Sequence, residues 1–307
     1  MISSTPDAPS HSRLACLAHC ERKYFYNYHV GYKGKQLFAP MHAGSAGHVG
    51  LEAWHRLSNR DAVSEAMHQA WSSHRFHGDF EYLTPGHLEC VLGNYMESKH
   101  TQGWQPVRLR RSDLVQEALL ITDAVEDADG YLVLAEASFV INVPDLGPIN
   151  MRPDLLLEQF GGRLCIVDHK FTTGWLGSKL YTRAKFEHQL RLYALGMSTL
   201  IGRPVESGLV NGIFMGEKAA QPAFKGQRFE PYSFDYTPAD FEETKAWYIA
   251  GRLRMQHIAE HYSLADEMQA QQNPGEHCGR CDYSLLCSTV PAMRPIEIKK
   301  SFTRRTS

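Results

Sequence analysis

Apolar positions repeat with a helical spacing through the first third of the chain. This pattern predicts four helices, at residues 12–28, 42–57, 62–77 and 86–102. Ser12 is the expected N-cap of the first helix, and Gly31 and Gly34 end it. Gly44 and Gly47 would allow another part of the chain to approach the second helix closely. The first third is therefore expected to be mostly α-helical.

The spacing changes near residue 114, where short β-branched or apolar runs are separated by Asp, Gly and Pro. Such runs predict strands at residues 114–122, 131–143, 154–158, 163–168 and 208–215. A helix at 181–200 is expected between the last two strands, and a long helix from Pro238 to about Met268 precedes a cysteine-rich tail. This order of elements predicts an α/β core with helical flanks.

The composition limits the number of domains and the kind of surface. With 307 residues, of which 43% are hydrophobic, the chain can form one elaborated domain or one domain plus a helical appendage. A formal net charge of −2 excludes a uniformly basic surface, so contact with nucleic acid must come from a local patch. Residues 1–10 are expected to be disordered. Because no signal peptide or membrane-spanning run is evident, we expect a soluble, cytoplasmic protein.

The stretch 152–170 carries candidate chemistry, because two apolar strands there flank a Gly-Gly turn at 161–162. This pattern predicts a β-hairpin, whose register decides which side chains meet. A two-residue loop would place Asp154 opposite His169. A three-residue loop that begins one position earlier would place Asp154 opposite Asp168.

The second register would bring two carboxylates and the ammonium of Lys170 to one face, at the end of a buried strand pair. Carboxylates this close repel each other, and a divalent cation removes that cost while it supplies a Lewis acid. Mg²⁺ or Mn²⁺ bound to Asp154 and Asp168 would suit phosphodiester hydrolysis, with Lys170 orienting the attacking water. The alternative is that both aspartates are turn residues and Lys170 is a solvated strand end.

Asp154 followed by Asp168-His169-Lys170 resembles the D…(D/E)-x-K signature of the PD-(D/E)XK nuclease superfamily. Arg152-Pro153 stands where RecB-like members commonly have a Gly-containing approach. The resemblance implies a restriction-endonuclease-like core, a mixed β-sheet flanked by helices. It implies one nuclease domain at residues 11–290, followed by a tail at 291–307. The domain is expected to consist of a helical part at 12–110, a catalytic α/β core at 111–236, and a C-terminal helix with the iron–sulfur region at 237–290.

Two further segments resemble RecB-like members. The segment around His48 resembles an upstream helix with a metal-ligating histidine, and Gln189 with Tyr193 resembles the family's Q-x-x-x-Y helix. The resemblance implies metal ligation by His48, Asp154, Asp168 and the backbone carbonyl of His169. It implies catalytic roles for Asp154, Asp168, Lys170, Gln189 and Tyr193. Glu136 is a weaker candidate, because several related nucleases have an acid on the strand before the hairpin but a solvent-facing Glu explains it equally well.

The chain has seven cysteines, and three of them form a C-x₂-C-x₅-C motif at Cys278, Cys281 and Cys287. Thiols this close in sequence need a fourth ligand to complete a metal site, and either Cys20 or Cys16, one helical turn earlier, could supply it. Cys90 and Cys165 are interpreted as buried, small apolar residues. An all-cysteine site suits Zn²⁺ as well as an iron–sulfur cluster.

The run Cys20-Glu21-Arg22-Lys23, paired with the distant cysteine motif, resembles the iron–sulfur subgroup of RecB-like nucleases. This subgroup includes AddB-type nucleases and CRISPR-associated RecB-like exonucleases. The resemblance implies a [4Fe–4S] cluster that joins the ends of the nuclease domain, held by Cys20, Cys278, Cys281 and Cys287. Zn²⁺ is the alternative cofactor at these thiols.

Together the motifs predict a Mg²⁺- or Mn²⁺-dependent DNA nuclease, an exonuclease that acts on single-stranded DNA or DNA ends. The alternatives are a non-catalytic DNA-binding or assembly module with the same fold and cluster, and a zinc-stabilised regulatory protein. Phosphate contacts are expected from basic residues with aromatic residues nearby for base stacking, at Lys33, Lys35, Arg183, Lys185 and Arg191. No helicase motif is evident, so a helicase, CRISPR or recombination partner would be a separate chain.

Overall fold

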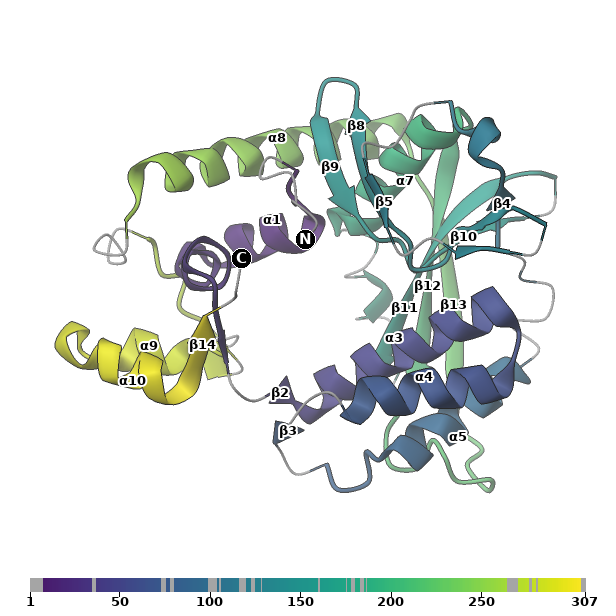
Figure 1. The fold of residues 1–307 in the computed structure, drawn as a ribbon, viewed down its shortest axis with the longest axis horizontal. Helices are drawn as coiled ribbons and strands as arrows, with labels where there is room; N and C mark the ends of the chain where they lie inside the picture. The colour runs from purple at the N-terminus through teal and green to yellow at the C-terminus, as the bar shows by residue number, and fades with distance from the viewer. Residues whose placement is uncertain are drawn as a thin grey trace. The chain divides into compact units, whose positions relative to one another are not determined.

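The computed structural model describes residues 8–34, 37–72, 76–77, 80–98, 104, 106–115, 120–122, 125–127, 129–159, 161–174, 176–177, 180–182, 185, 187–263, 270–275, 278–279 and 281–304. The chain divides into two compact units (Figure 1). We call residues 1–8 and 37–244 the core unit, and residues 9–36 and 245–307 the terminal unit. The expected single domain at 11–290 stays a prediction, and the expected disorder of residues 1–10 falls largely outside the described residues.

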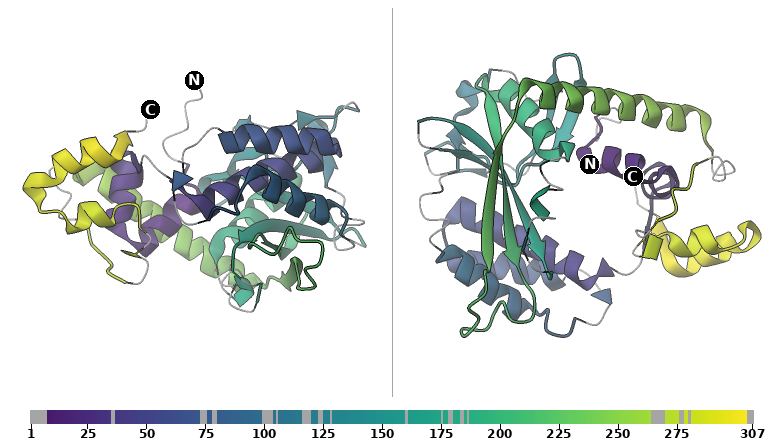
Figure 2. Two further views of the ribbon diagram at one scale, coloured as in Figure 1. Left: turned by 90° about the horizontal axis from the view of Figure 1, so that it is seen from below. Right: turned by 180° about the vertical axis from the view of Figure 1, so that it is seen from behind.

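A four-stranded mixed sheet with the strand order β10-β11-β12-β13 forms the centre of the core unit. β10 (Leu155–Glu158) and β11 (Leu164–Thr172) form an antiparallel hairpin, and β11 pairs in parallel with β12 (Val205–Phe214). β13 (Phe229–Asp235) lies antiparallel to β12 at one edge (Figure 2). The prediction of an α/β fold with a mixed sheet flanked by helices is confirmed.

Helices cover both faces of this sheet. α3 (Ala39–Leu57) packs on the face formed by odd-numbered residues of β11, where Gly47 lies against Phe171. α7 (His188–Ile201) connects β11 to β12 and packs on the even-numbered face, where Gln189 reaches Asp168. Because both faces are covered, β11 begins as an uninterrupted buried apolar run instead of an alternating one.

The hairpin adopts the second of the two registers that the sequence allows. Leu155 pairs with Val167, so the next pair outward is Asp154 and Asp168. Both glycines of the turn at 161–162 have positive φ, at 83° and 81°. Side chains disfavour this backbone region, so the turn depends on glycine. The register therefore brings the two aspartates opposite each other at the end of the hairpin.

Two smaller sheets extend the core unit. One has the order β5-β8-β9 and the other β4-β7-β6, with bounds β4 (Arg108–Leu109), β5 (Leu120–Thr122), β6 (Val125–Glu126), β7 (Leu132–Val133), β8 (Ser138–Val143) and β9 (Gly147–Met151). The single strand expected at 131–143 is wrong, because the left-handed backbone of Glu136 separates β7 from β8. β9 and β13 were not predicted. Pro148 and Pro231 interrupt the apolar alternation in these two strands, and proline is tolerated only at unpaired or edge positions.

The helical first third is confirmed, with bounds that differ by a few residues from those expected. After β2 (Leu37–Phe38), α3 is followed by α4 (Arg60–Ser72), β3 (Phe76–His77), α5 (Pro85–Met96) and the short 3₁₀ helix η2 (Arg111–Asp113). Buried side chains of α3, α4 and α5 form one cluster with Ile213, Phe214 and Phe229 of the sheet. This cluster fixes α3 against the odd-numbered face.

The terminal unit is built from two segments that are distant in sequence. Its elements are α1 (His11–His19), α2 (Glu21–Tyr24), the π-helix η1 (Phe25–Val30), β1 (Tyr32–Gly34), the greater part of α8 (Pro238–His261), α9 (Ser284–Ser288), η5 (Pro291–Met293), α10 (Arg294–Ser301) and β14 (Phe302–Arg304). β1 pairs antiparallel with β14. None of the described helices is long and apolar enough to cross a membrane.

Three expectations for helix ends are wrong. Ser10, not Ser12, is the N-cap of α1, because its hydroxyl accepts from the Arg13 amide. The helix is interrupted at Cys20, whose backbone is extended. α8 ends at His261, and Met268 lies outside the described residues. Gly31 ends η1 as expected, in a left-handed conformation with φ 81°.

The two cysteines outside the predicted metal motif differ in environment. Cys165 is fully buried in β11, as expected. Cys90 is exposed, so its interpretation as a buried apolar residue is wrong. It lies on the outer side of α5, where its thiol donates to the carbonyl of Ala220 at 3.3 Å.

The two glycines of α3 provide a matched test of its packing. A Cβ at Gly47 would lie 2.5 Å from the Phe171 ring, whereas a Cβ at Gly44 would lie in ordinary contact at 3.6 Å. We expect Gly47→Ala to lower the free energy of unfolding by about 1–3 kcal/mol through overpacking. Gly44→Ala should leave it unchanged or raise it by up to about 1 kcal/mol, because alanine favours helix. Urea unfolding measures both, and equal effects would contradict the close contact at Gly47.

Candidate active site and metal centre

Three side chains with metal-binding atoms come together in the core unit: His48 on α3, Glu136 between β7 and β8, and Asp154 just before β10. One ligand atom of each lies within 4.8 Å of the other two. His48 Nδ1 is 2.9 Å from Glu136 Oε1 and 3.5 Å from Asp154 Oδ2. Within the part of the chain that the structure describes, no other three such groups lie this close.

Glu136, the weaker candidate from the sequence, is central to this group. Its backbone has φ 51°, a left-handed conformation that is unfavourable for a residue other than glycine. Its amide donates to the carbonyls of Pro153 and Asp154, at 3.1 and 3.0 Å. Arg152 Nε donates to Glu136 Oε2 at 3.1 Å and to the Glu136 carbonyl at 2.9 Å. These contacts hold a buried carboxylate beside His48. The available signal was an acid within the apolar run 132–137.

Asp168 and Lys170 lie side by side on the even-numbered face of β11. Lys170 Nζ is 2.9 Å from each carboxylate oxygen of Asp168. From α7, Gln189 Nε2 approaches Asp168 Oδ1 at 3.4 Å. The structure thus brings Asp168, Lys170 and Gln189 together next to Asp154, its partner in the hairpin register. Their predicted catalytic roles stay predictions.

His169 contributes its backbone amide to the site. This amide donates to Asp154 Oδ2 at 2.6 Å and so fixes the orientation of the carboxylate. The imidazole of His169 lies on the opposite face of the sheet, where its Nδ1 is 3.1 Å from Asn211 Nδ2 and its ring stacks on His55 at 5.7 Å. The predicted ligation by the His169 carbonyl stays a prediction.

The site concentrates negative charge in a buried environment, and the pKa values reflect it. Burial raises the pKa of Asp154 to about 6, against the opposing effect of His48. Burial likewise raises the pKa of Asp168 to about 6, against the opposing effect of Lys170. For His48, burial lowers the pKa, but Asp154 and Glu136 outweigh it and bring the pKa to about 9. Each carboxylate is therefore more stable when it is protonated or lies beside a cation than when it is ionised without a partner.

Lys170 and Tyr193 keep their protons in this environment. Burial lowers the pKa of Lys170, but the carboxylates of Asp168 and Asp154 outweigh it, so the pKa lies above its usual value. Burial raises the pKa of Tyr193 to about 12, with further contributions from Asp154 and Asp168. Both side chains therefore act as hydrogen-bond donors near neutral pH.

The basic residues expected to contact phosphate differ in their environments. Lys33, in the terminal unit, and Lys185, in the core unit, are exposed, and Lys35 and Arg183 lie outside the described residues. The expectation for Arg191 is wrong, because only 3% of this residue is exposed. Its guanidinium pairs with Asp240 and Glu243, each at 2.8 Å, so its charge is already neutralised.

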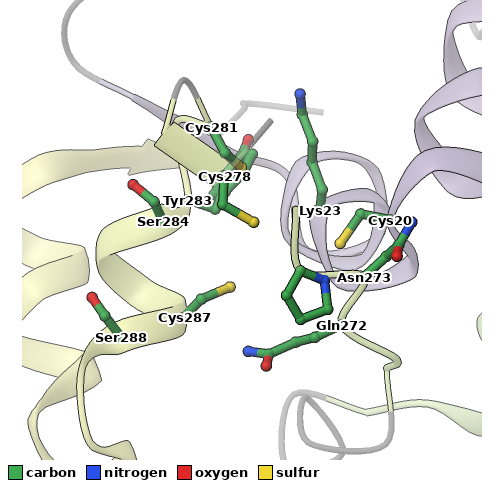
Figure 3. A pocket seen from close by; sticks show the side chains of 11 residues that line it. Cys20, Lys23, Gln272, Asn273, Cys278, Cys281, Tyr283, Ser284, Cys287 and Ser288 are labelled. Carbon is green, nitrogen blue, oxygen red and sulfur yellow. The ribbon is translucent and has the colours of Figure 1, made fainter. Parts of the chain in front are cut away.

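The terminal unit contains a cavity of about 260 Å³ that is lined by Cys20, Cys278, Cys281 and Cys287. Their sulfur atoms point into the same space (Figure 3). Cys16 does not line this cavity. Burial raises the pKa of the Cys281 and Cys287 thiols. Among the four, no three sulfur atoms lie within 4.8 Å of one another.

Comparison with known proteins identifies the family. The model of the PD-(D/E)XK nuclease superfamily matches residues 8–288. The chain therefore belongs to the PD-(D/E)XK nuclease superfamily, a group of nucleases that use divalent metal ions. The His48, Glu136 and Asp154 group could hold such an ion. No curated protein matches the chain.

Two solved structures that match the chain have low sequence identity to it. One is a provisionally assigned exonuclease from Eubacterium rectale, with a TM-score of 0.47 and 10% identity, covering 94% of this chain and 99% of that chain. Another is the crystal structure of SSO0001, with a TM-score of 0.37 and 14% identity, covering 94% of this chain and 88% of that chain.

Metal binding should depend on pH in a direction that the site determines. Mn²⁺ can bind only after the ligands lose their protons, and their pKa values are about 6 for Asp154 and about 9 for His48. We therefore expect affinity to rise from about pH 5 to about pH 9, with protons released on binding. Isothermal titration calorimetry in buffers of different ionisation enthalpy measures both quantities.

Two histidine variants test the source of this dependence. His48→Ala should weaken Mn²⁺ binding and remove the rise in affinity above about pH 7. His68→Ala, on the exposed surface of α4, should leave the profile unchanged. An affinity that does not vary with pH would contradict ligation by His48.

Proposed function

We propose that this chain is a Mg²⁺- or Mn²⁺-dependent deoxyribonuclease, an exonuclease that hydrolyses single-stranded DNA or DNA ends. The observation that supports this most is the convergence of His48, Glu136 and Asp154, with ligand atoms within 4.8 Å of one another. Asp168 and Lys170 adjoin this group on the even-numbered face. Membership of the PD-(D/E)XK nuclease superfamily supports metal-dependent hydrolysis of a phosphodiester bond.

The donor atoms fit a hard divalent cation. Carboxylate oxygens of Glu136, Asp154 and Asp168 suit Mg²⁺ and Mn²⁺, and the imidazole of His48 favours Mn²⁺ more than Mg²⁺. These carboxylates are buried, and burial raises the pKa of Asp154 and Asp168, so a bound cation would stabilise their ionised forms. A divalent ion here would act as a Lewis acid toward the scissile phosphate and would make a bound water more acidic.

The protein side chains would position the reactants. Lys170, which keeps its proton, would donate to the attacking water or to a phosphate oxygen, where it would balance the developing charge. Gln189 lies within 3.4 Å of Asp168 and would orient that carboxylate, and the phenol of Tyr193 would donate toward the site or the DNA backbone. The amide of His169 holds Asp154 in place. Each group thus has a role that does not require it to act as a base.

The nuclease assignment is tested with labelled linear DNA and Mn²⁺. Lys170→Met should lower the cleavage rate on the order of 10²–10³-fold, because it removes the donor that stabilises charge in the transition state. Lys218→Met, which removes an exposed lysine of the core unit that has no predicted contact with phosphate, should retain most of the activity.

The outcomes separate the candidate functions. Absence of cleavage by the unmodified protein, with DNA binding retained, would favour a non-catalytic DNA-binding or assembly module. Cleavage of covalently closed circular DNA at the same rate as linear DNA would contradict an exonuclease. Equal rates for Lys170→Met and the unmodified protein would contradict the role of Lys170.

We also propose that Cys20, Cys278, Cys281 and Cys287 hold a [4Fe–4S] cluster. The four thiols line one cavity of about 260 Å³, and four thiolates around a shared space are the ligand set of a cuboidal cluster. Cys20 lines the cavity and Cys16 does not, which supports Cys20 as the fourth ligand.

The cluster assignment has a direct spectroscopic test. Protein purified anaerobically should be brown, with absorbance near 400 nm and about four iron atoms per chain. Cys20→Ala should lose this absorbance, whereas Cys16→Ala, one helical turn away, should keep it. A colourless protein that contains zinc, or loss of the absorbance in Cys16→Ala alone, would contradict the assignment.

A further inference from the structure

The register of the sheet links the candidate active site to an exposed aromatic side chain on the edge strand β13. Asp168 on β11 pairs with Val210 on β12, and Val210 pairs with Tyr232 on β13. Paired residues in a sheet point to the same face, so Tyr232 shares a face and a cross-strand row with Asp168. Neighbouring strands lie about 4.8 Å apart, so the backbone of Tyr232 is about 10 Å from that of Asp168.

Tyr232 is the exposed member of a stacked pair of tyrosines. Its ring lies 5.2 Å from that of Tyr181, with an angle of 26° between the planes. Tyr232 is 41% exposed, whereas Tyr181 is 4% exposed. A large aromatic ring that remains accessible to solvent on a supported surface can stack with another flat ring.

Buried contacts hold the supporting tyrosine in place. The Tyr181 hydroxyl donates to Glu230, with Oε2 at 2.8 Å and the carbonyl oxygen at 3.1 Å. It lies above Gly212, where an added Cβ would be only 2.9 Å from the hydroxyl oxygen. Gly212 pairs with Lys170, so the tyrosine pair spans the two rows of the sheet that carry Asp168 and Lys170. The platform is therefore positioned by the same strands as the active site.

Further aromatic rings pack beside Tyr232 along β13. Phe234 lies two residues along β13, with its ring 6.0 Å from that of Tyr232, and is itself 5.6 Å from Tyr236. Both are 9% exposed. Little side-chain entropy remains to be lost at such a ring when a ligand stacks on it.

We propose that Tyr232, supported by Tyr181, is a stacking site for an unpaired base of the DNA strand held at the metal centre. This inference rests on the proposed function and adds the substrate class, single-stranded DNA. A base has a flat face that stacks on tyrosine whatever its sequence. In a duplex both faces of each internal base are already stacked, so this site selects a strand whose bases are free.

The inference is tested by DNA binding, measured as fluorescence anisotropy of a labelled oligothymidylate. Every protein carries Lys170→Met, so that the DNA stays intact. Tyr232→Leu keeps an apolar side chain but removes the ring, and it should weaken binding about five- to tenfold or more. Tyr232→Phe keeps the ring and should bind within about twofold of the parent. Circular dichroism confirms that each variant is folded.

Tyr131→Leu is the matched control, because this partly exposed tyrosine of the core unit stacks with Arg108 and Arg110 and lies outside the cross-strand row. It should not weaken oligothymidylate binding. Blunt duplex DNA should lose little affinity with Tyr232→Leu. Three results would each overturn the inference. One is an equal loss of affinity in Tyr232→Leu and Tyr131→Leu, and another is an equal loss in Tyr232→Leu and Tyr232→Phe. The third is that Tyr232→Leu weakens the binding of duplex DNA as much as that of single-stranded DNA.

Removal of one base at a time provides a second measurement. An oligonucleotide with an abasic site at the position that stacks on Tyr232 should lose about the same affinity as Tyr232→Leu does, and the two changes together should cost no more than one. Additive losses at every abasic position would overturn the inference. If the unmodified protein cleaves no DNA but these binding effects are found, the nuclease proposal fails and the stacking site stands.

Discussion

Mutual repulsion among buried carboxylates is the constraint around which the core unit is organised. Glu136 lies before the hairpin that carries Asp154 and Asp168, and the structure offsets the charge of these three carboxylates with His48 and Lys170. A buried carboxylate without such compensation would be protonated or would destabilise the fold. The ionised carboxylates therefore destabilise the folded site when no ligand is bound, and a divalent cation would stabilise them most directly.

The sequence predicts those parts of the site whose residues lie close together along the chain, because their spacing then determines how they are arranged. Asp154, Asp168 and Lys170 lie within one hairpin, so a single turn decides their register, and the two glycines of that turn limit the choice. Gln189 and Tyr193 are one helical turn apart, which places them on one face of α7. In both cases the distance along the chain is short enough for local geometry to decide.

The remaining features depend on long-range contacts or on unusual backbone. The apolar residues at 131–143 predict one continuous strand. The left-handed backbone of Glu136 interrupts that strand between β7 and β8, and this interruption allows its carboxylate to reach His48. Arg191 has a basic character in the sequence but is neutralised by acidic residues about fifty positions later. β13 includes Pro231 and exposed polar residues, which an edge strand accommodates and a central one would not. No local pattern carries this information.

The order of the ligands along the chain has a consequence for biosynthesis. His48 is translated long before Glu136, Asp154 and Asp168, and α7 follows them. The site is therefore complete only after the ribosome has released residues beyond 193. Contacts between segments so far apart form late in folding. A nascent chain would thus carry an incomplete centre, and hydrolytic potential would arise only once the β11–α7–β12 crossover has closed. Such a delay would limit the exposure of cellular DNA to partly synthesised enzyme.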